Sequence, residues 1–224
     1  MGAKTLPGGL LVTFEGVEGA GKSTQWSKLA ARLRGEEVAV APLHEPGSTL
    51  VGDHLRELLL KAVDVPLLGV AELFLYLAAR AQLVNELIKV ALAAGRVVLC
   101  DRFVDSTAAY QGYGRGLDLS LIEKLNRLAV DGIWPSLTVL LDLDPSVGLA
   151  RSTAGRQDRD RFERESLAFH RRVREGYLAL ARGEPSRFLV LDAAQDPAAI
   201  TDAVWKAVEP HLRGAAPAPT PPAG

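Results

Sequence analysis

A glycine-rich segment near the amino terminus most constrains how this chain can fold. The segment reads GVEGAGKST, residues 16–24, and it follows the apolar run 10–14. Leu29 and Leu33 come after it at a spacing that places both on one helix face. Glycines allow the backbone N–H groups of such a loop to turn toward one point, and the helix start adds a partial positive charge there. The segment therefore predicts a strand, an anion-binding loop and a helix.

The same residues match the P-loop pattern G-x-x-x-x-G-K-[ST] in the strand–loop–helix context that the pattern requires. In this pattern the lysine reaches the β- and γ-phosphates of a nucleotide and the serine binds Mg²⁺. We therefore predict that ATP is bound by Gly16, Val17, Glu18, Gly19, Ala20, Gly21, Lys22, Ser23 and Thr24. A P-loop alone does not separate kinases from GTPases, motor ATPases or transporters, but the sequence has no Asn-Lys-x-Asp guanine-binding motif.

Short apolar runs alternate with stretches of helical periodicity along the chain, which is typical of parallel strands joined by helices. Strands are expected near 9–15, 37–41, 96–100, 137–142 and 187–191. Helices are expected over 22–34, 50–61, 70–94, 119–131, 162–182 and 197–211. The 224 residues, 48% of them hydrophobic, suffice for one buried core. We predict one α/β domain over 1–213 and a disordered tail in the Pro/Ala-rich stretch 214–224.

Composition and charge exclude several other classes of protein. The single cysteine, Cys100, rules out an intrachain disulfide and a cysteine cluster for zinc, and indicates an intracellular protein with a buried strand thiol. No apolar run reaches the roughly 20 residues that span a bilayer, and no secretion signal is present, so we expect a cytoplasmic protein without membrane contact. The formal net charge of −1 gives no overall positive field for nucleic acid. His44, His54, His170 and His211 show no metal-ligand spacing and are expected to be surface or packing residues.

A second group of candidate residues follows the third predicted strand. Asp101 and Arg102 come directly after RVVLC, and the carboxyl ends of parallel strands face the ligand crevice of an open sheet. Asp101 could hold Mg²⁺ through a water molecule, and Arg102 could bind a phosphate with both guanidinium nitrogens, although a structural ion pair is the alternative. The next stretch, 103–116, contains too many Gly, Tyr and small residues for a well-packed helix and is expected to be a binding segment.

Five fragments, in this order, resemble bacterial thymidylate kinase: FEGVEGAGKST, HEPGST, LYLAARAQ, DRFVDSTAAYQGYGRG and DRFERES. The likeness extends from about residue 9 to residue 211. It implies a three-layer P-loop NTPase fold whose five-stranded parallel sheet has the order 2-3-1-4-5, with a short lid, and a homodimer to which helix 70–94 could contribute. It also implies transfer of the γ-phosphoryl group of ATP to dTMP with Mg²⁺, giving dTDP and ADP for dTTP synthesis.

The resemblance also assigns an acceptor site. Glu18 would approach the 3′-hydroxyl of the sugar, while Arg56 and Arg102 would bind the acceptor phosphate from two sides. Tyr76 would stack on thymine at a position where the family usually has phenylalanine, and Arg80 would contact a thymine oxygen. The full dTMP-binding set that it implies is Glu18, Glu45, Pro46, Arg56, Tyr76, Arg80, Arg102, Ser106, Thr107, Tyr110 and Gln111. Two members of this set, Thr107 and Tyr110, would read the pyrimidine edge and exclude a 2′-hydroxyl, supported by Ser106 and Gln111.

The arginines of RSTAGRQDRDR, residues 151–161, are assigned to a lid. One branch of the family carries arginine in the P-loop, whereas the bacterial branch has glycine there, as Gly19 is here, and supplies lid arginines instead. We expect Arg156, then Arg159, to contact the γ-phosphate and Arg151 to bind ATP, with Arg161 also over the phosphates. The predicted catalytic residues are Glu18, Lys22, Arg102, Arg156 and Arg159, and the predicted metal ligands are Ser23 and Asp101. A charged, solvated helix start is the alternative for the lid.

Two departures from the family pattern and three other functions remain open at this stage. His44 stands where relatives commonly have arginine, and Ser48 where they have glycine, so this segment departs from the family pattern for binding the acceptor phosphate. A kinase for another nucleoside monophosphate or for a deoxynucleoside would share the P-loop, the lid and the Asp–Arg pair. A P-loop switch that binds nucleotide and a protein partner is an alternative of another class. Nucleic-acid binding would rest on the arginines of 151–174, which are interleaved with acids.

Overall fold

The computed structural model describes residues 3–62, 64–154 and 158–214, and its five strands form one parallel sheet. The strand order is β2-β3-β1-β4-β5, as expected. The strands are β1 (Leu10–Glu15), β2 (Val40–His44), β3 (Val97–Asp101), β4 (Leu137–Asp142) and β5 (Phe188–Asp192). Register is fixed by pairs such as Val12 with Leu99 on one side of β1 and Val12 with Leu137 on the other. The central strand β1 is fully buried because helices cover both faces of the sheet.

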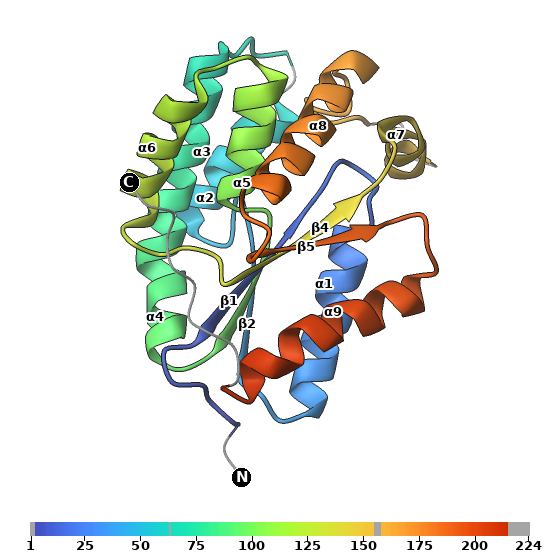
Figure 1. Ribbon diagram of the computed structural model, residues 1–224. Coiled ribbons are helices and arrows are strands. Elements are labelled where there is room, and N and C mark those ends of the chain that lie inside the picture. Colours follow the sequence, from blue (N-terminus) through green and yellow to red (C-terminus); the bar gives the residue numbers. More distant parts are fainter. Residues whose placement is uncertain (1–2, 63, 155–157, 215–224) are drawn as a thin grey trace.

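The helices divide into two layers (Figure 1). One face is covered by α1 (Lys22–Gly35) and α9 (Pro197–Leu212), which contact each other. The other side carries α3 (Gly69–Leu83), α4 (Lys89–Ala93), α5 (Val104–Thr107), α6 (Leu119–Val130) and α8 (Leu167–Gly183). The remaining helices are α2 (Leu50–Arg56) and α7 (Pro145–Thr153), and none of the helices in the described ranges is long and apolar enough to cross a membrane.

Alternation along the strands explains why a separate core forms on each face of the sheet. In β1, Phe14 packs with Leu29 and Leu33 of α1, whereas Leu11 packs with Val98 and Ile88 on the opposite face. Cys100 belongs to this second core and is a buried free thiol, as expected for a strand cysteine. Burial of these side chains on both faces of the sheet is the main contribution to folding.

The second strand lies three residues later than the sequence indicates. The prediction was 37–41, but the ladder with β3 begins where Val40 meets Val97. Glu37 has a positive φ of 60°, so it forms a turn, and Val38 makes an isolated parallel bridge with Lys4 from the amino-terminal segment. The apolar pattern alone does not show that Val38 pairs with a different part of the chain.

The segment 103–116 is helical, so the prediction of a non-helical binding segment was wrong about its structure. It forms α5 and then a π-helical segment, η3 (Ala108–Gly114). Its glycines permit close packing rather than breaking the helix, because an added Cβ at Gly114 would lie 2.7 Å from Phe169 of α8. At Gly112 an added Cβ would lie 2.4 Å from Leu119. Helix–helix contact therefore outweighs the low helix propensity of glycine.

Three other expected helices are confirmed with changed boundaries. The stretch 50–61 is α2 followed by a π-helical turn, η1 (Glu57–Lys61), and 70–94 is α3, a second π-helical turn, η2 (Val84–Ile88), and α4. Helix α8 begins at Leu167 rather than at 162, because the Ser166 side chain accepts from the N–H of Phe169 and caps it. Helix α7 was not expected; Asp144 caps it and Pro145 occupies its first position.

Candidate active site

The candidate site lies at the carboxyl ends of β1, β2 and β3, where a cavity of about 230 Å³ opens. The P-loop, the start of α1, the ends of α2 and α3, α5, η3 and the segment before α8 all line it. Predicted residues on its wall are Glu18, Gly19, Lys22, Ser23, Glu45, Pro46, Arg56, Tyr76, Arg80, Asp101, Arg102, Ser106, Thr107, Tyr110 and Gln111. Residues predicted for the ATP side and residues predicted for the acceptor side therefore line one cavity.

The P-loop adopts the conformation that its glycines permit. Gly16, Gly19 and Gly21 all have positive φ values, of 137°, 68° and 89°. An added Cβ at Gly19 would lie 2.0 Å from the carbonyl oxygen of Gly148 in α7, so this position has no room for an arginine without a shift of α7. Of the other predicted residues, Gly16, Val17, Ala20 and Gly21 belong to the same loop and Thr24 lies in the first turn of α1, but none of them lines the cavity wall.

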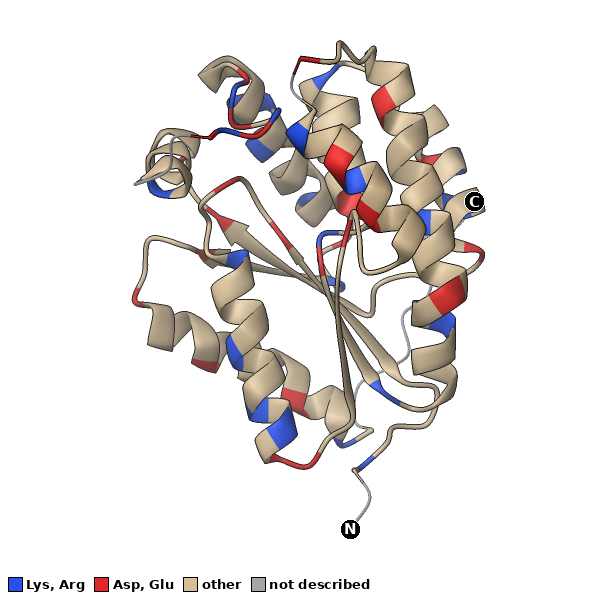
Figure 2. Ribbon diagram, turned by 180° about the vertical axis from the view of Figure 1, so that it is seen from behind, with Lys and Arg blue, Asp and Glu red and all other residues tan. Residues whose placement is uncertain are grey.

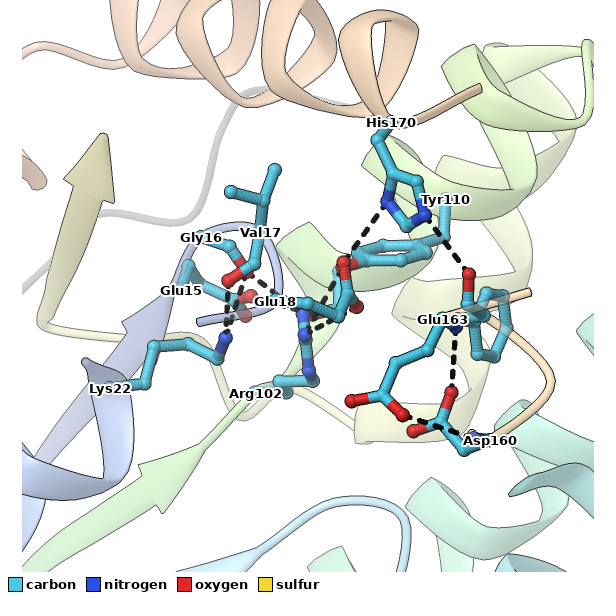
Figure 3. Close-up of polar contacts among 12 residues, drawn as sticks. Glu15, Gly16, Val17, Glu18, Lys22, Arg102, Tyr110, Asp160, Glu163 and His170 are labelled. Carbon is cyan, nitrogen blue, oxygen red and sulfur yellow. Dashed lines mark hydrogen bonds and ion pairs between the residues drawn. The ribbon is translucent and has the colours of Figure 1, made fainter. Parts of the chain in front are cut away.

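Lys22 lies across the P-loop. Its Nζ donates to the carbonyl oxygen of Gly16 at 3.0 Å and to that of Val17 at 2.9 Å (Figure 3). Burial, with the nearby positive charge of Arg102, lowers the pKa of Lys22 to about 8. An anion in the loop would restore the charged form, because a negative group at this position opposes both effects.

The two predicted metal ligands meet across the site. Ser23 Oγ donates to Asp101 Oδ2 at 3.0 Å, although 78 positions separate the two residues. A hydroxyl and a carboxylate are the oxygen ligands that Mg²⁺ prefers, and Mg²⁺ keeps several waters and substrate phosphate oxygens as its other ligands. The described residues include no group of three His, Cys, Asp or Glu side chains that could hold a metal without such help. The residues therefore fit Mg²⁺ that arrives with a nucleotide.

Arg102 joins the P-loop to the helices beyond it. Its Nη1 donates to the carbonyl oxygen of Gly16 and to the hydroxyl of Tyr177, both at 3.1 Å. Its Nη2 donates to Glu18 Oε1 and to the hydroxyl of Tyr110, also at 3.1 Å. The backbone of Arg102 has φ 70°, an unfavourable value for a residue with a side chain, which these contacts maintain.

Glu18 is the acidic partner in this cluster. Besides Arg102, its Oε1 accepts from the hydroxyl of Tyr110, and its Oε2 lies 3.1 Å from Nδ1 of His170. Burial by itself raises the pKa of Glu18, but His170 and Arg102 outweigh burial and lower that pKa to about 2. Glu18 is thus a carboxylate at every physiological pH. His170, predicted as a surface or packing residue, is instead a buried partner of the P-loop acid.

Glu15 was not among the predicted site residues, yet its carboxyl group accepts hydrogen bonds from residues of this cluster. Glu15 is fully buried; its Oε1 accepts from the N–H of Phe103, and its Oε2 accepts from Ser106 at 2.6 Å and from Tyr177 at 2.8 Å. Burial raises the pKa of Glu15 to about 7, and the nearby Asp105 adds to this. A buried acid in the strand ahead of a P-loop was the available signal, since strand residues of this kind are ordinarily apolar.

The residues predicted to contact the base are more deeply buried, and make more hydrogen bonds within the protein, than the resemblance implies. Arg80 is 0% exposed, and its guanidinium donates to Glu45, Asn126, the Phe103 carbonyl and Thr107 Oγ1. Glu45 is likewise buried, and the Glu45–Pro46 peptide is cis. The ring of Tyr76 lies 6.3 Å from that of Phe162, across the cavity wall.

The remaining residues predicted to bind the acceptor make hydrogen bonds to other groups of the protein. Arg56 donates through Nη1 to the Pro46 carbonyl at 2.8 Å, and Gln111 donates to Glu72 at 2.8 Å. His44 lines the cavity, so it is not an ordinary surface histidine, and burial together with Arg56 lowers its pKa. Ser48 accepts from the N–H of His44 at 2.9 Å, so the two departures from the family pattern contact each other.

The structure describes three of the four expected lid arginines, and none of these three lines the cavity wall. Arg156 lies outside the described residues. Arg151 lies in the last turn of α7 and donates to the Ala193 carbonyl at 3.3 Å, while Arg159 is exposed. Arg161 does not lie over the phosphate site, because it donates to the carbonyls of Leu59 and Ala62 at the end of η1. The segment that follows α7 carries alternating positive and negative residues (Figure 2).

The stretch before α8 contributes cavity residues that the sequence analysis did not select. Asp160, Phe162 and Glu163 all line the wall, together with Leu60 and Ser152. Phe162 packs edge-on against Tyr110 with ring centroids 5.2 Å apart. An aromatic residue within an arginine-rich stretch was the available signal, because aromatic side chains are usually buried in packed contacts.

Comparisons with known proteins agree with this geometry. The family model described as thymidylate kinase matches residues 14–204. Thymidylate kinases of Solidesulfovibrio magneticus and a Synechococcus strain are 55% and 51% identical over 89% and 94% of this chain, which cover 98% and 100% of those proteins. The crystal structure of thymidylate kinase from Ehrlichia chaffeensis matches with a TM-score of 0.74 at 35% identity, covering 91% of this chain and 99% of that one. With the P-loop, the Asp101–Arg102 pair and the sheet order in place, the chain belongs to the thymidylate kinase family.

Proposed function

We propose that the protein transfers the γ-phosphoryl group of ATP to dTMP, giving ADP and dTDP. The observation that carries this proposal is that Lys22 and Arg102 line the same cavity and both donate to one carbonyl oxygen, that of Gly16. One cation belongs to a phosphate-binding loop, and the other lies at the end of the neighbouring strand. Two phosphate groups bound by these cations would lie next to each other, which is what transfer between them requires.

The chemistry needs no covalent enzyme intermediate. An oxygen of the dTMP phosphate bonds to the γ-phosphorus, while the bond from that phosphorus to the β–γ bridging oxygen breaks and its electron pair leaves with ADP. The reaction is slow in water because both reactants are anions that repel each other. Lys22, Arg56 and Arg102 would offset this repulsion and stabilise the charge that spreads over the transferring group.

Ser23 and Asp101 would hold Mg²⁺, and Ser23 is the closer candidate for direct contact because it lies in the first turn of α1, beside the loop. Bound there, Mg²⁺ supplies charge neutralisation at the β- and γ-phosphates. Asp101 would act through a water molecule or by fixing the serine hydroxyl. Arg151, Arg156 and Arg159 are proposed to cover the ATP phosphates from the lid at 151–161 when substrates bind, with residues 1–213 acting as one kinase domain.

We propose that the residues of the cavity wall opposite the P-loop determine which acceptor nucleotide is bound. Tyr76 offers a ring face to a pyrimidine, and Thr107 and Tyr110 narrow the space at the sugar. Glu18 would accept from the 3′-hydroxyl, for which an ionised carboxylate is suited. A kinase for another monophosphate would need a different wall at these positions, and a nucleotide-dependent switch would not need an acceptor pocket beside the P-loop.

The test is phosphorylation by the purified protein with ATP and Mg²⁺ and each of dTMP, dUMP, dCMP, AMP and thymidine as acceptor. We expect dTDP to form fastest and thymidine to be unreactive. Omission of Mg²⁺ should abolish turnover. Absence of any dTDP under these conditions would end the proposal, and faster turnover of AMP or dCMP would replace dTMP as the substrate.

We further propose that the protein acts in the cytoplasm, where ATP is available, and that it forms a homodimer. The dimer is proposed because α3 and α6 present exposed apolar side chains. Phe74 is 55% exposed and Leu128 78% exposed, on two helices that contact each other. A second copy of the chain would cover them. Sedimentation should give a dimer for the wild type and a monomer for Phe74→Glu. The control, Val190→Glu, changes an exposed residue of the edge strand β5 and should stay dimeric; a monomeric wild type would refute the dimer.

A further inference from the structure

His170 lies on α8, outside every group of residues that the sequence associates with nucleotide binding, yet it contacts the site. Its ring is buried between the P-loop and the segment that precedes α8. Its Nε2 lies 3.0 Å from the carbonyl oxygen of Phe162, and its Nδ1 lies 3.1 Å from Glu18 Oε2 (Figure 3). One imidazole thus joins a wall residue of the cavity to the P-loop acid.

The partners fix which ring nitrogens carry protons. A carbonyl oxygen only accepts, so Nε2 must be the donor to Phe162. Nδ1 faces a carboxylate oxygen that also only accepts, so a lone pair there would be repelled. Neither Glu18 Oε2 nor His170 Nδ1 has a hydrogen-bond partner within the described residues, and both atoms are buried. Only a proton on Nδ1 makes this pair of atoms compatible, and the ring is then an imidazolium.

We propose that protonated His170 is a positioning residue that holds Glu18 in the orientation in which it binds the sugar of dTMP. Glu18 has two oxygens with different partners: Oε1 accepts from Arg102 and Tyr110, and Oε2 faces His170. Contacts at both ends fix the plane of the carboxylate. Without the charge on His170, Oε2 is a buried anion with no partner, and the carboxylate turns away from the acceptor.

The charges around His170 are consistent with this role. Burial disfavours the imidazolium, but Glu18 from the P-loop and Glu165 from the segment before α8 outweigh burial and raise the pKa of His170 above its ordinary value. Arg115 pairs with Glu165, and Arg102 pairs with Glu18, so each acid also has a guanidinium partner. The link is therefore intact below the raised pKa of His170 and is lost as the pH rises through it.

This inference rests on the proposed dTMP kinase activity, and two substitutions separate the two ring contacts. In His170→Asn the amide nitrogen lies near the position of Nδ1, so the contact with Glu18 is kept and that with Phe162 is lost. In His170→Gln the amide nitrogen lies near Nε2, so the opposite contact is kept. His211→Asn is the matched control, because His211 lies near the end of α9 and lines a different cavity.

Steady-state kinetics should show that His170→Gln raises KM for dTMP by about tenfold, the factor that one charge-assisted contact is worth, with KM for ATP unchanged. His170→Asn should stay within about threefold of the wild type, since a neutral donor replaces part of the contact. Urea unfolding of each variant checks that it is folded. Equal changes in both KM values, or equal effects of the two substitutions, would mean that His170 only supports the fold.

The pH dependence gives a second readout. The ratio of KM for dTMP in the wild type to that in His170→Asn should rise as the pH increases from 6 to 9, because only the wild type loses a charge at residue 170. Titrations of the substrate phosphate and of Lys22 occur in both proteins and cancel in the ratio. A ratio that does not change with pH would overturn the inference while leaving the kinase activity in place.

NMR titration of the imidazole tests the contact without any turnover. The pKa of His170 should be above that of His211 in the wild type and should fall in Glu18→Gln, which keeps the size of the side chain but removes its charge. An unchanged His170 pKa in Glu18→Gln would refute the pairing. A wild type that forms no dTDP but shows this shift would refute the proposed function and leave the pairing standing.

Discussion

Lys22 and Arg102 donate to the same carbonyl oxygen, that of Gly16, from 3.0 and 3.1 Å. Eighty positions of sequence separate the two cations, and both lie at the carboxyl edge of the sheet because β1 and β3 are adjacent and in parallel register. Such close approach of like charges is tolerated because Lys22 also donates to the carbonyl oxygen of Val17 and Arg102 pairs with Glu18. Two anionic groups drawn to these cations would occupy one small cavity.

Replacement of either cation should therefore affect turnover more than folding. We expect Lys22→Ala and Arg102→Ala each to lower kcat/KM by about 10³-fold, the effect typical of a charge that contacts transferring phosphate. Arg102→Lys should recover only part of this, because an ammonium group lacks the two-pronged donor geometry of arginine. Steady-state assays with dTMP and ATP measure the effect, and Lys206→Ala on the exposed face of α9 is the control. Wild-type rates in either alanine variant would remove that residue from the reaction.

The close contact between the P-loop and α7 should be sensitive to a single methyl group. An added Cβ at Gly148 would lie 2.2 Å from the carbonyl oxygen of Glu18, so Gly148→Ala must displace either the helix or the loop. We expect KM for ATP to rise and stability to fall by about 1–3 kcal/mol, measured by kinetics and urea unfolding. Gly183→Ala, where an added Cβ meets nothing within 4 Å, should be neutral. A neutral Gly148→Ala would contradict the contact.

Tyr76 should act on the acceptor alone. Tyr76→Ala removes the ring that lines the cavity opposite the P-loop, and loss of a stacking surface costs about 1–3 kcal/mol per base. We expect KM for dTMP to rise by about tenfold or more with KM for ATP unchanged, whereas Tyr76→Phe keeps the ring and should resemble the wild type. Initial-rate measurements with each substrate varied in turn give the two KM values. A rise in KM for ATP would contradict the prediction that Tyr76 contacts only the acceptor.

Glu15 should give stability a distinct pH dependence. Burial raises the pKa of its carboxyl from 4.5 to about 7, so the folded state binds the proton more tightly than the unfolded state. That contribution is complete below pH 4.5 and is lost as the pH rises to about 7, for a total of about 3 kcal/mol. Urea unfolding between pH 4.5 and 8 should show the wild type losing stability relative to Glu15→Gln, whose amide does not titrate. Parallel curves for the two proteins would show that Glu15 has an ordinary pKa.

Local sequence determined much of this protein. The loop 16–24, the strand and helix beside it, and Asp101–Arg102 at a strand end follow from residue types and spacing, because glycine conformation, hydrophobic periodicity and parallel-strand geometry act over short distances. The family resemblance supplied the sheet order, which the strand pairing confirms.

Tertiary contacts decided the rest. The segment 103–116 is helical because its glycines fit against Leu119 and against Phe169, which is distant in the chain. Likewise, β2 starts at Val40 because Val38 pairs with the distant Lys4. In the same way, the ionisation of Glu15 and the placement of His170 beside Glu18 depend on which groups are buried together. Burial and pairing are properties of the assembled fold, so no local stretch of residues contains them.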